Sequence, residues 1–447
     1  MAETRRDFLK VTGAGIVGLA VGAAAGYYLA PPKIVEKPVP QKPPEVPKEP
    51  LKIGVITILS GPGALLFDPG LKALQMEVEK INANGGILGR KIELSIKDSG
   101  GKPENSVDFF RRLVEEEGVE FVISGSTSAE AIALAPVAEQ KKQVLIIEEG
   151  TVAKLFEEVD TNPKYVFRIN NYDILDSTSL AIAMKKIWPD VKKFAVIGAD
   201  YAWGHDTWDI LKGAIEKLYP DMEVVAETWP PLFSQDFSSH ISTVIAAKPD
   251  VVALVLWGGD LVTCIKQGVQ YGLFKDIKGI SPTGGEYVWA AGTDTPDNLL
   301  MSTRYYFTYP PWDKWWPNRE FNLEFHNRYP DSHGGWPGFN CNSSYYAIHF
   351  LKAAIERAYA IYGGWPTQEQ VTEALEGLMI PGPGGYRYIR PEDHQSLGYA
   401  ITGLTKQDPR YGFAILDPIE AVPPEEMAPP PGVKWKDWIK HWGEEYL

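Results

Sequence analysis

From residue 51 onward, two kinds of hydrophobic pattern alternate along the chain. Short runs rich in β-branched residues, such as LKIGVITIL at 51–59, are bounded by Gly, Pro and Ser and are typical of buried strands. Longer segments repeat apolar residues every three or four positions, which predicts helices over 71–83, 105–117 and 129–141. Buried strands separated by helices of this length predict βαβ units and parallel sheets.

A second series of the same kind follows. Its strands are predicted at 193–200, 223–230 and 250–259, and its helices at 204–218, 237–247 and 260–268. The two series are separated near 168–176, so the pattern predicts two similar α/β lobes. We expect a cleft between the lobes, because open parallel sheets bind ligands at the carboxyl ends of their strands.

Residues 1–30 do not share this pattern. Arg5 and Arg6 precede Phe-Leu-Lys and a weakly hydrophobic stretch, which resembles a twin-arginine export signal. The alternative is an ordinary N-terminal anchor helix with basic flanking residues. Residues 31–50 are rich in proline, which predicts an extended linker, either behind a cleaved signal or between a membrane anchor and the folded part. We therefore expect a periplasmic or extracellular protein, with tethering to the outer face of the cytoplasmic membrane left open.

Composition and charge argue against several other classes. The formal net charge, 44 − 58 = −14, disfavours a nucleic-acid partner. Cys264 and Cys341 are too few for a disulfide framework or a four-thiolate zinc site, and whether they pair stays open. The histidines form no HExxH or His-x-His motif, so no metal is predicted. The turn at 61–63 lacks the third glycine of a dinucleotide fingerprint and no GxxxxGK[ST] loop occurs, so no cofactor is expected.

Several stretches resemble the periplasmic leucine/isoleucine/valine-binding proteins, the solute receptors of ABC importers. They are IGVITILSGPGA with EVEKINANGGILGRKIELSIKDS near the start, then YVFRINNYD, DFSSHISTVIAAKPDVVALVLWGGD, and GPGGYRYIRPEDHQ near the end. The resemblance extends over 51–419. It implies an α/β, type I periplasmic-binding-protein fold, in which two Rossmann-like lobes are joined by a three-strand hinge with the ligand cleft between them.

The resemblance also implies how the chain is divided. The first lobe would comprise 51–170 and 303–385, the second lobe 171–302 and 386–425, and a C-terminal tail would occupy 426–447. Such receptors are monomers that close on a ligand by hinge motion, deliver it to a membrane permease and catalyse nothing.

The loop at 124–129 lies between a predicted strand and a predicted helix. Its hydroxyl groups and the free N–H groups of a helix N-terminus form an anion site without a basic side chain. The alternative is an ordinary Ser/Thr helix cap. The resemblance implies that Thr127 and Ser128, together with Ser126, hold the α-carboxylate of the ligand.

One strand later, Gly150 and Thr151 match the loop whose carbonyl and hydroxyl groups accept hydrogen bonds from the ligand's ammonium in the family. Glu148 and Glu149 precede them, where the family usually has small residues. These glutamates form either a solvated loop pair or an additional cation-binding carboxylate.

Four more residues take their expected roles from the resemblance. Trp203 stands in place of a tyrosine that covers the ligand, and packing in the core is its alternative. Glu286 is the nearest match to the ammonium-binding acid, and a solvated loop glutamate is the alternative. Leu66 and Phe67 lie near the position that packs on the ligand's side chain.

Aromatic residues are dense at 305–336, where they either line a wide pocket or, as we favour, seal a lobe. The tryptophans of the C-terminal tail either pack onto a lobe or bind a membrane surface.

These observations predict an extracytoplasmic receptor of an ABC importer that binds a small branched-chain or other apolar amino acid and delivers it to the permease. A receptor or sensor of the same fold for an amide, urea or an aromatic carboxylate is the second hypothesis. An exported enzyme is the third, but GxSxG is absent and no Cys/His pairing is visible.

Overall fold

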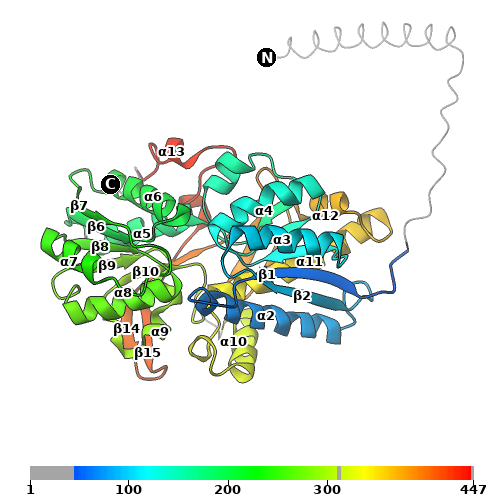
Figure 1. The fold of residues 1–447 in the computed structure, drawn as a ribbon, viewed down its shortest axis with the longest axis horizontal. Coiled ribbons are helices and arrows are strands. Elements are labelled where there is room, and N and C mark those ends of the chain that lie inside the picture. The colour runs from blue at the N-terminus through cyan, green and yellow to red at the C-terminus, as the bar shows by residue number, and fades with distance from the viewer. Residues whose placement is uncertain (1–44, 310–313, 444–447) are drawn as a thin grey trace, which may run out of the picture. The chain divides into compact units, whose positions relative to one another are not determined.

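The computed structural model describes residues 45–309 and 314–443 (Figure 1). The predicted export signal, with Arg5 and Arg6, and most of the predicted linker lie outside the described residues. Among the helices that are described, none combines the length and the apolarity that crossing a membrane requires.

A five-stranded parallel sheet, in the order β2-β1-β3-β4-β5, forms the first lobe. Its strands are β1 (Leu51–Thr57), β2 (Ile92–Asp98), β3 (Phe121–Ser124), β4 (Leu145–Ile147) and β5 (Val166–Arg168). Its helices are α2 (Ala64–Ala83), α3 (Pro103–Glu115), α4 (Ser128–Lys141), α11 (Phe339–Tyr362) and α12 (Gln368–Leu375). α3 and α4 pack on one face, and α2, α11 and α12 on the other, which explains why the central strands are apolar throughout (Figure 1).

A seven-stranded sheet, in the order β15-β14-β10-β9-β8-β6-β7, forms the second lobe. Its strands are β6 (Lys193–Gly198), β7 (Glu223–Thr228), β8 (Val251–Val255), β9 (Lys278–Ser281), β10 (Leu300–Thr303), β14 (Ala400–Asp408) and β15 (Phe413–Val422). β6 to β10 are parallel, and the β14–β15 hairpin adds antiparallel to β10. α5 (Asp173–Ile187) and α6 (Ala202–Leu218) cover one face, and α7 (Ser238–Ala247) and α8 (Gly258–Tyr271) the other (Figure 1).

The chain passes between the two sheets after β5, after β10 and before β14. A small antiparallel sheet of β11 (Met379–Gly382), β12 (Gly385–Ile389) and β13 (Ser396–Leu397) precedes the last passage. The remaining elements of the described chain are η1 (Leu155–Val159), η2 (Gly284–Glu286), α9 (Val288–Ala291), η3 (Gly292–Asp294), α10 (Trp316–Arg328), η4 (His333–Gly335), η5 (Pro424–Glu426) and α13 (Trp435–Trp438).

The helix predicted over 71–83 begins earlier, at Ala64. Pro69 and Gly70 suggest a break in the sequence, but the helix continues through both. A side chain at Gly70 would collide with Asn340, because a Cβ there would lie 1.8 Å from its Oδ1 atom. The glycine therefore permits close packing of α2 against α11 rather than ending the helix.

Both cysteines are buried free thiols, Cys264 on α8 and Cys341 on α11. The C-terminal segment packs on the second lobe. Trp442 is buried and its Nε1 donates to the Glu426 carbonyl at 2.7 Å, while Trp435 lies over Gly213 of α6.

Candidate functional site

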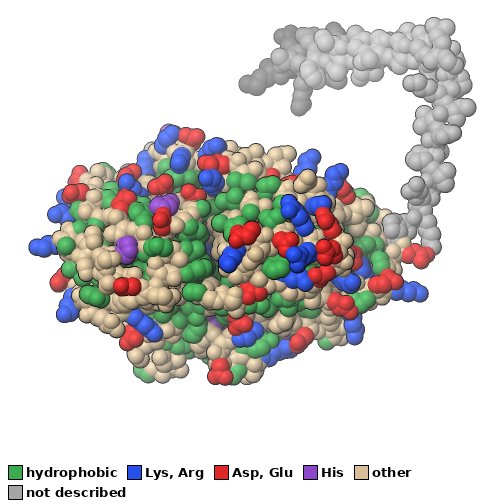
Figure 2. Space-filling view, viewed as in Figure 1, with side chains coloured by type: hydrophobic (Ala, Val, Ile, Leu, Met, Phe, Trp, Pro, Cys, Tyr) green, Lys and Arg blue, Asp and Glu red, His purple; other side chains and the backbone are tan. Residues whose placement is uncertain are grey.

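A cavity lies between the loops that follow β3 and β4 of the first sheet and β6, β8 and β9 of the second. Its empty space, including the open mouth, is about 350 Å³. On the surface, hydrophobic side chains gather in the band between the two halves of the molecule (Figure 2). Every residue predicted for the ligand site lines this cavity except Glu286: Leu66, Phe67, Ser126, Thr127, Ser128, Gly150, Thr151 and Trp203. The residues that complete the lining were not predicted from the sequence, apart from Glu149: Glu149, Tyr201, Trp257, Thr283, Tyr287, Arg304 and Phe339.

One end of the cavity is the N-terminus of α4. Thr127 caps the helix, since its Oγ1 accepts a hydrogen bond from the Glu130 N–H at 3.3 Å while Glu130 Oε2 accepts from the Thr127 N–H at 2.8 Å. The hydroxyl proton of Thr127 remains available to an acceptor in the cavity. Ser126 Oγ is buried and has no hydrogen-bond partner among the described residues. This end therefore offers hydroxyl donors and helix N–H groups to an anion.

The neighbouring loop, at 149–151, is already engaged by two arginines. The Gly150 carbonyl accepts a hydrogen bond from Arg168 Nη1 at 3.1 Å. Thr151 Oγ1 accepts from Arg304 Nη2 at 3.0 Å, and Glu149 Oε2 from Arg304 Nη1 at 2.6 Å. The groups predicted to accept hydrogen bonds from a ligand ammonium are thus occupied by guanidinium donors.

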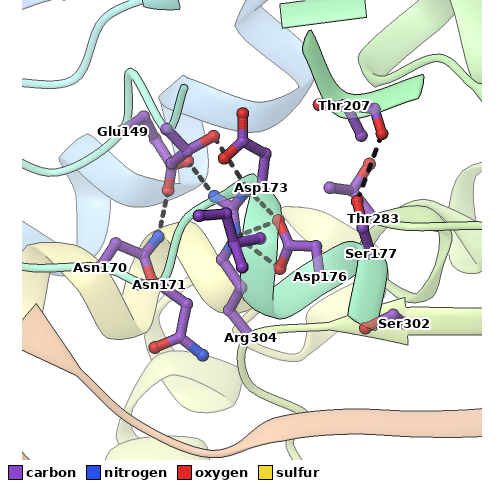
Figure 3. A network of polar contacts seen from close by, with 12 residues as sticks. Glu149, Asn170, Asn171, Asp173, Asp176, Ser177, Thr207, Thr283, Ser302 and Arg304 are labelled. Atoms are coloured by element: carbon purple, nitrogen blue, oxygen red, sulfur yellow. Dashed lines mark hydrogen bonds and ion pairs between the residues drawn. The ribbon is translucent and has the colours of Figure 1, made fainter. Parts of the chain in front are cut away.

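Arg304 follows β10 and lies between acids from both lobes, as Figure 3 shows. Besides Glu149, it binds Asp176 of α5, with Nη2 to Oδ2 at 2.6 Å and Nε to Oδ2 at 3.0 Å. Its guanidinium also lies 5.0 Å from the centre of the Phe339 ring. Although burial opposes the charge, Asp176 and Glu149 raise the pKa of Arg304, so it stays protonated.

The interpretation of Glu148 and Glu149 as a solvated pair is wrong, because they are only 4% and 5% exposed. Burial raises the pKa of Glu149 to about 7, against the opposing effect of Arg304, and Asn170 Nδ2 donates to its Oε1 at 2.7 Å. Burial raises the pKa of Glu148 to about 8. Glu148 is therefore mostly neutral at pH 7 and does not line the cavity, while Glu149 does so as the partner of Arg304.

The remaining walls are aromatic. Trp203, from the first turn of α6, is buried in the cluster of the second lobe and also faces the cavity, 6.2 Å from the Tyr201 ring. Phe67 of α2 faces it from the first lobe and makes an edge contact with Trp257 at 6.3 Å. An apolar ligand body would therefore lie between rings from both lobes.

Glu286 does not reach this cavity, which corrects its predicted position. Its Oε2 accepts a hydrogen bond from the Phe339 N–H at 2.7 Å, and its Oε1 lies 3.1 Å from His333 Nε2. The carboxylate thus sits at the N-terminus of α11, where the helix dipole favours a negative charge. It lines a separate small cavity with residues such as Trp289 and Trp336.

The described residues of the aromatic segment at 305–336 pack on one another and on both lobes, with Phe321 and Phe325 against α2 and α11 of the first. Tyr305 donates to Asn318 Oδ1 at 2.6 Å, and Phe307 stacks on Trp336 with ring centres 5.3 Å apart. Its described residues contribute nothing to the lining of the ligand cavity, which favours packing against the lobes over a wider pocket.

Of the residues that sequence reasoning missed, Arg304 carried one signal: a charged residue directly after the buried β-strand LMST. Phe339 and Tyr287 carried none, because each reaches the cavity through the packing of a distant segment.

Comparisons with known proteins agree with this geometry. A family profile described as periplasmic binding protein matches residues 50–401. A Leu/Ile/Val-binding protein homolog 4 of Brucella melitensis is 25% identical over 369 residues, covering 78% of this chain and 82% of the relative. The Leu/Ile/Val-binding protein BraC3 of Rhizobium johnstonii is 27% identical over 341 residues, covering 74% and 85%.

Solved structures share the fold. A leucine-binding protein of Thermotoga maritima has a TM-score of 0.70 at 19% identity, covering 84% of this chain and 99% of that one. A solute-binding protein of an R. palustris ABC transporter, in complex with benzoate, has a TM-score of 0.73 at 20% identity, covering 86% and 99%. With two α/β lobes around a small cavity, this chain belongs to the periplasmic binding protein family, the extracytoplasmic receptors that bind solutes for ABC transporters without transforming them.

Proposed function

We propose that this receptor binds a small carboxylate that has an apolar body and no ammonium group, and that it delivers this solute to an ABC permease. One observation carries the proposal: Arg304 and Arg168 already occupy Glu149, Thr151 and the Gly150 carbonyl, the expected acceptors for an ammonium. An ammonium placed there would compete with two guanidinium groups for these acceptors, and burying it without acceptors is unfavourable.

The carboxylate would lie at the N-terminus of α4. There the hydroxyl groups of Ser126 and Thr127 and the first N–H groups of the helix can donate to it. Trp203 and Phe67 would cover the apolar body from either lobe, which suits a ring or a branched chain.

A branched-chain or other apolar amino acid is the second candidate. The names of the curated relatives favour it, since they describe Leu/Ile/Val-binding proteins. It requires the ligand's ammonium to share acceptors with Arg304. An amide or urea is less suited to the site, because neither uses an anion site.

Matched ligand pairs separate the two candidates. Leucine and 4-methylpentanoate differ by the α-ammonium alone, as do phenylalanine and 3-phenylpropanoate. Isothermal titration of the purified protein should give at least about tenfold tighter binding of the deaminated member in each pair, equivalent to about 1.4 kcal/mol. Tighter binding of leucine than of 4-methylpentanoate would restore the amino-acid assignment.

Export and assembly complete the proposal. We infer that Arg5 and Arg6 direct export by the twin-arginine route and that the receptor acts as a monomer. Replacing both arginines with lysine should leave the protein in the cytoplasmic fraction, and light scattering should give a mass near 49.6 kDa for the full chain. Export of the lysine variant would instead favour the ordinary anchor helix, and retention of the mature protein in the membrane fraction would indicate an uncleaved tether.

A further inference from the structure

A second, larger cavity lies where the chain first crosses between the lobes, and its empty space, including the open mouth, is about 700 Å³. Its walls come from η1, from the end of β5, from the segment 390–395 and from the C-terminal segment 429–434. The proposed ligand site does not use it.

Arg168 is the most deeply buried charge in this cavity, 1% exposed. Its Nε donates to Gln395 Oε1 at 2.5 Å and its Nη1 to the Val152 carbonyl at 2.7 Å, as well as to Gly150. No acceptor in the described part of the chain takes a hydrogen bond from Nη2, and no carboxylate there lies within 4.0 Å of the guanidinium. The rings of Phe156 and Tyr172 flank it at 5.1 and 4.8 Å. Arg168 therefore presents a buried positive group, with two N–H bonds unused, to the cavity.

The nearest acids are engaged elsewhere. Asp173, the acid that most strongly opposes the lowering of the Arg168 pKa by burial, accepts a hydrogen bond from the Ala153 N–H at 3.0 Å. Asp393 forms an ion pair with Arg390, which also donates to the Pro429 carbonyl at 2.9 Å. Glu157 accepts a hydrogen bond from the Trp435 N–H at 2.8 Å. Lys434, exposed at the rim, has no ion-pair partner among the described residues. Two cations thus face the cavity without a directly bound counter-ion.

We propose that this cavity binds a small organic monocarboxylate, held by Arg168 Nη2 and Lys434. The occupied Nε and Nη1 atoms leave one guanidinium nitrogen for the ligand, which suits a single carboxylate oxygen. Glu157, Glu392 and Asp393 in the walls disfavour a dianion such as phosphate. Pro430 and Val433 provide an apolar wall for the rest of the molecule.

The position of Arg168 connects this cavity with the ligand cavity. The same guanidinium holds the carbonyls of Gly150 and Val152, and Gly150 lines the ligand cavity. An occupant on Nη2 would fix the arginine, and with it the loop at 149–151. The two sites are therefore expected to influence each other's affinity.

The test measures propionate binding by isothermal titration to the full chain and to surface variants. Val433→Trp fills the cavity, Lys434→Glu reverses the rim charge, and Lys436→Glu is the matched control on the same exposed segment. All titrations are repeated in a Thr127→Ala/Ser128→Ala background, which weakens any binding of propionate in the ligand cavity. Thermal unfolding verifies that each variant is folded.

We expect one propionate site that persists in the Thr127/Ser128 background, is lost in Val433→Trp and is about tenfold weaker in Lys434→Glu. Lys436→Glu should bind as the parent does, and inorganic phosphate should not compete. No propionate binding, binding that Val433→Trp leaves unchanged, or equal loss in the Lys436→Glu control would each overturn the proposal. Failure here would leave the ligand cavity and its proposed function untouched.

Discussion

Arg304 Nη1 lies 2.6 Å from Glu149 Oε2, so that a residue at the end of β10 in the second lobe is ion-paired to the loop after β4 in the first. Arg304 also binds Asp176, and all three side chains are at most 7% exposed. Removing the Arg304 guanidinium would leave the carboxyl groups of Glu149 and Asp176 buried without a bound cation. We expect Arg304→Gln to lower the free energy of unfolding by about 3–5 kcal/mol, measured by urea denaturation.

A surface arginine provides the control. Arg328 also contacts two acids, Glu79 and Glu324, but its side chain is 35% exposed. Arg328→Gln should cost at most about 1 kcal/mol. Equal losses in the two variants would mean that the buried cluster does not stabilise the fold beyond an ordinary surface pair.

The cluster also marks where sequence reasoning reached its limit. The alternation of strands and helices predicted both lobes, because βαβ units are determined by local hydrophobic periodicity. The loops at 124–129 and 149–151 could be located because each directly follows a predicted strand. The ion-pair partner of Glu149, in contrast, is Arg304, and no local sequence pattern encodes a contact between residues so far apart in the chain.

Glu286 illustrates the same limit. The resemblance to the family predicted that Glu286 contacts the ligand. In the structure, however, the start of α11 packs against the Glu286 side chain at Gly338. A Cβ at Gly338 would lie 2.1 Å from Glu286 Oε1. The lobe boundaries at 170, 302 and 385 also rest on the resemblance alone and stay a prediction.

Glu148 should make stability depend on pH. Its pKa rises from the ordinary 4.5 to about 8 on folding, so between these values the folded state holds a proton that the unfolded state has lost. Stability attributable to this group is therefore highest below pH 4.5 and falls as the pH rises towards 8, by up to about 1.4 kcal/mol per pH unit. Glu148→Gln keeps the neutral form and should become more stable than the parent protein as the pH increases.

Urea denaturation at pH 5.5 and pH 8 tests this prediction. The difference between Glu148→Gln and the parent should grow in favour of the variant at the higher pH. Glu158→Gln, on the exposed side of η1, should follow the parent at both values. A difference that is constant with pH would show that Glu148 is ionised in the folded protein.

Thr127 and Ser128 should determine affinity for a carboxylate. The double variant Thr127→Ala/Ser128→Ala removes both hydroxyl donors, and we expect binding of the best carboxylate to weaken by about 1–3 kcal/mol for each charge-assisted hydrogen bond lost. Loss of the Thr127 cap should also lower stability by about 1 kcal/mol.

Thr127→Ser separates the two effects, since it keeps a hydroxyl group at the cap. It should retain most of the stability and most of the affinity, as measured by thermal unfolding and isothermal titration. An unchanged dissociation constant in the double variant would mean that the ligand carboxylate does not bind at the N-terminus of α4.

Glu286→Gln should leave ligand affinity unchanged, because Glu286 faces the Phe339 N–H and His333 in a separate cavity. Its effect should appear in stability instead. Burial alone would lower the pKa of His333, but the neighbouring Glu286 raises it above its ordinary 6.5. The stabilisation from this pair is therefore fully present below pH 6.5 and is lost as the pH rises through the folded pKa of His333.

Thermal unfolding should show Glu286→Gln to be less stable than the parent at pH 5.5, and this difference in stability should narrow at pH 8.5. Isothermal titration with 4-methylpentanoate or leucine should give the affinity of the parent protein. A large loss of affinity for leucine alone, with no loss for 4-methylpentanoate, would return Glu286 to the role of ammonium acceptor and require α11 to move when the ligand binds.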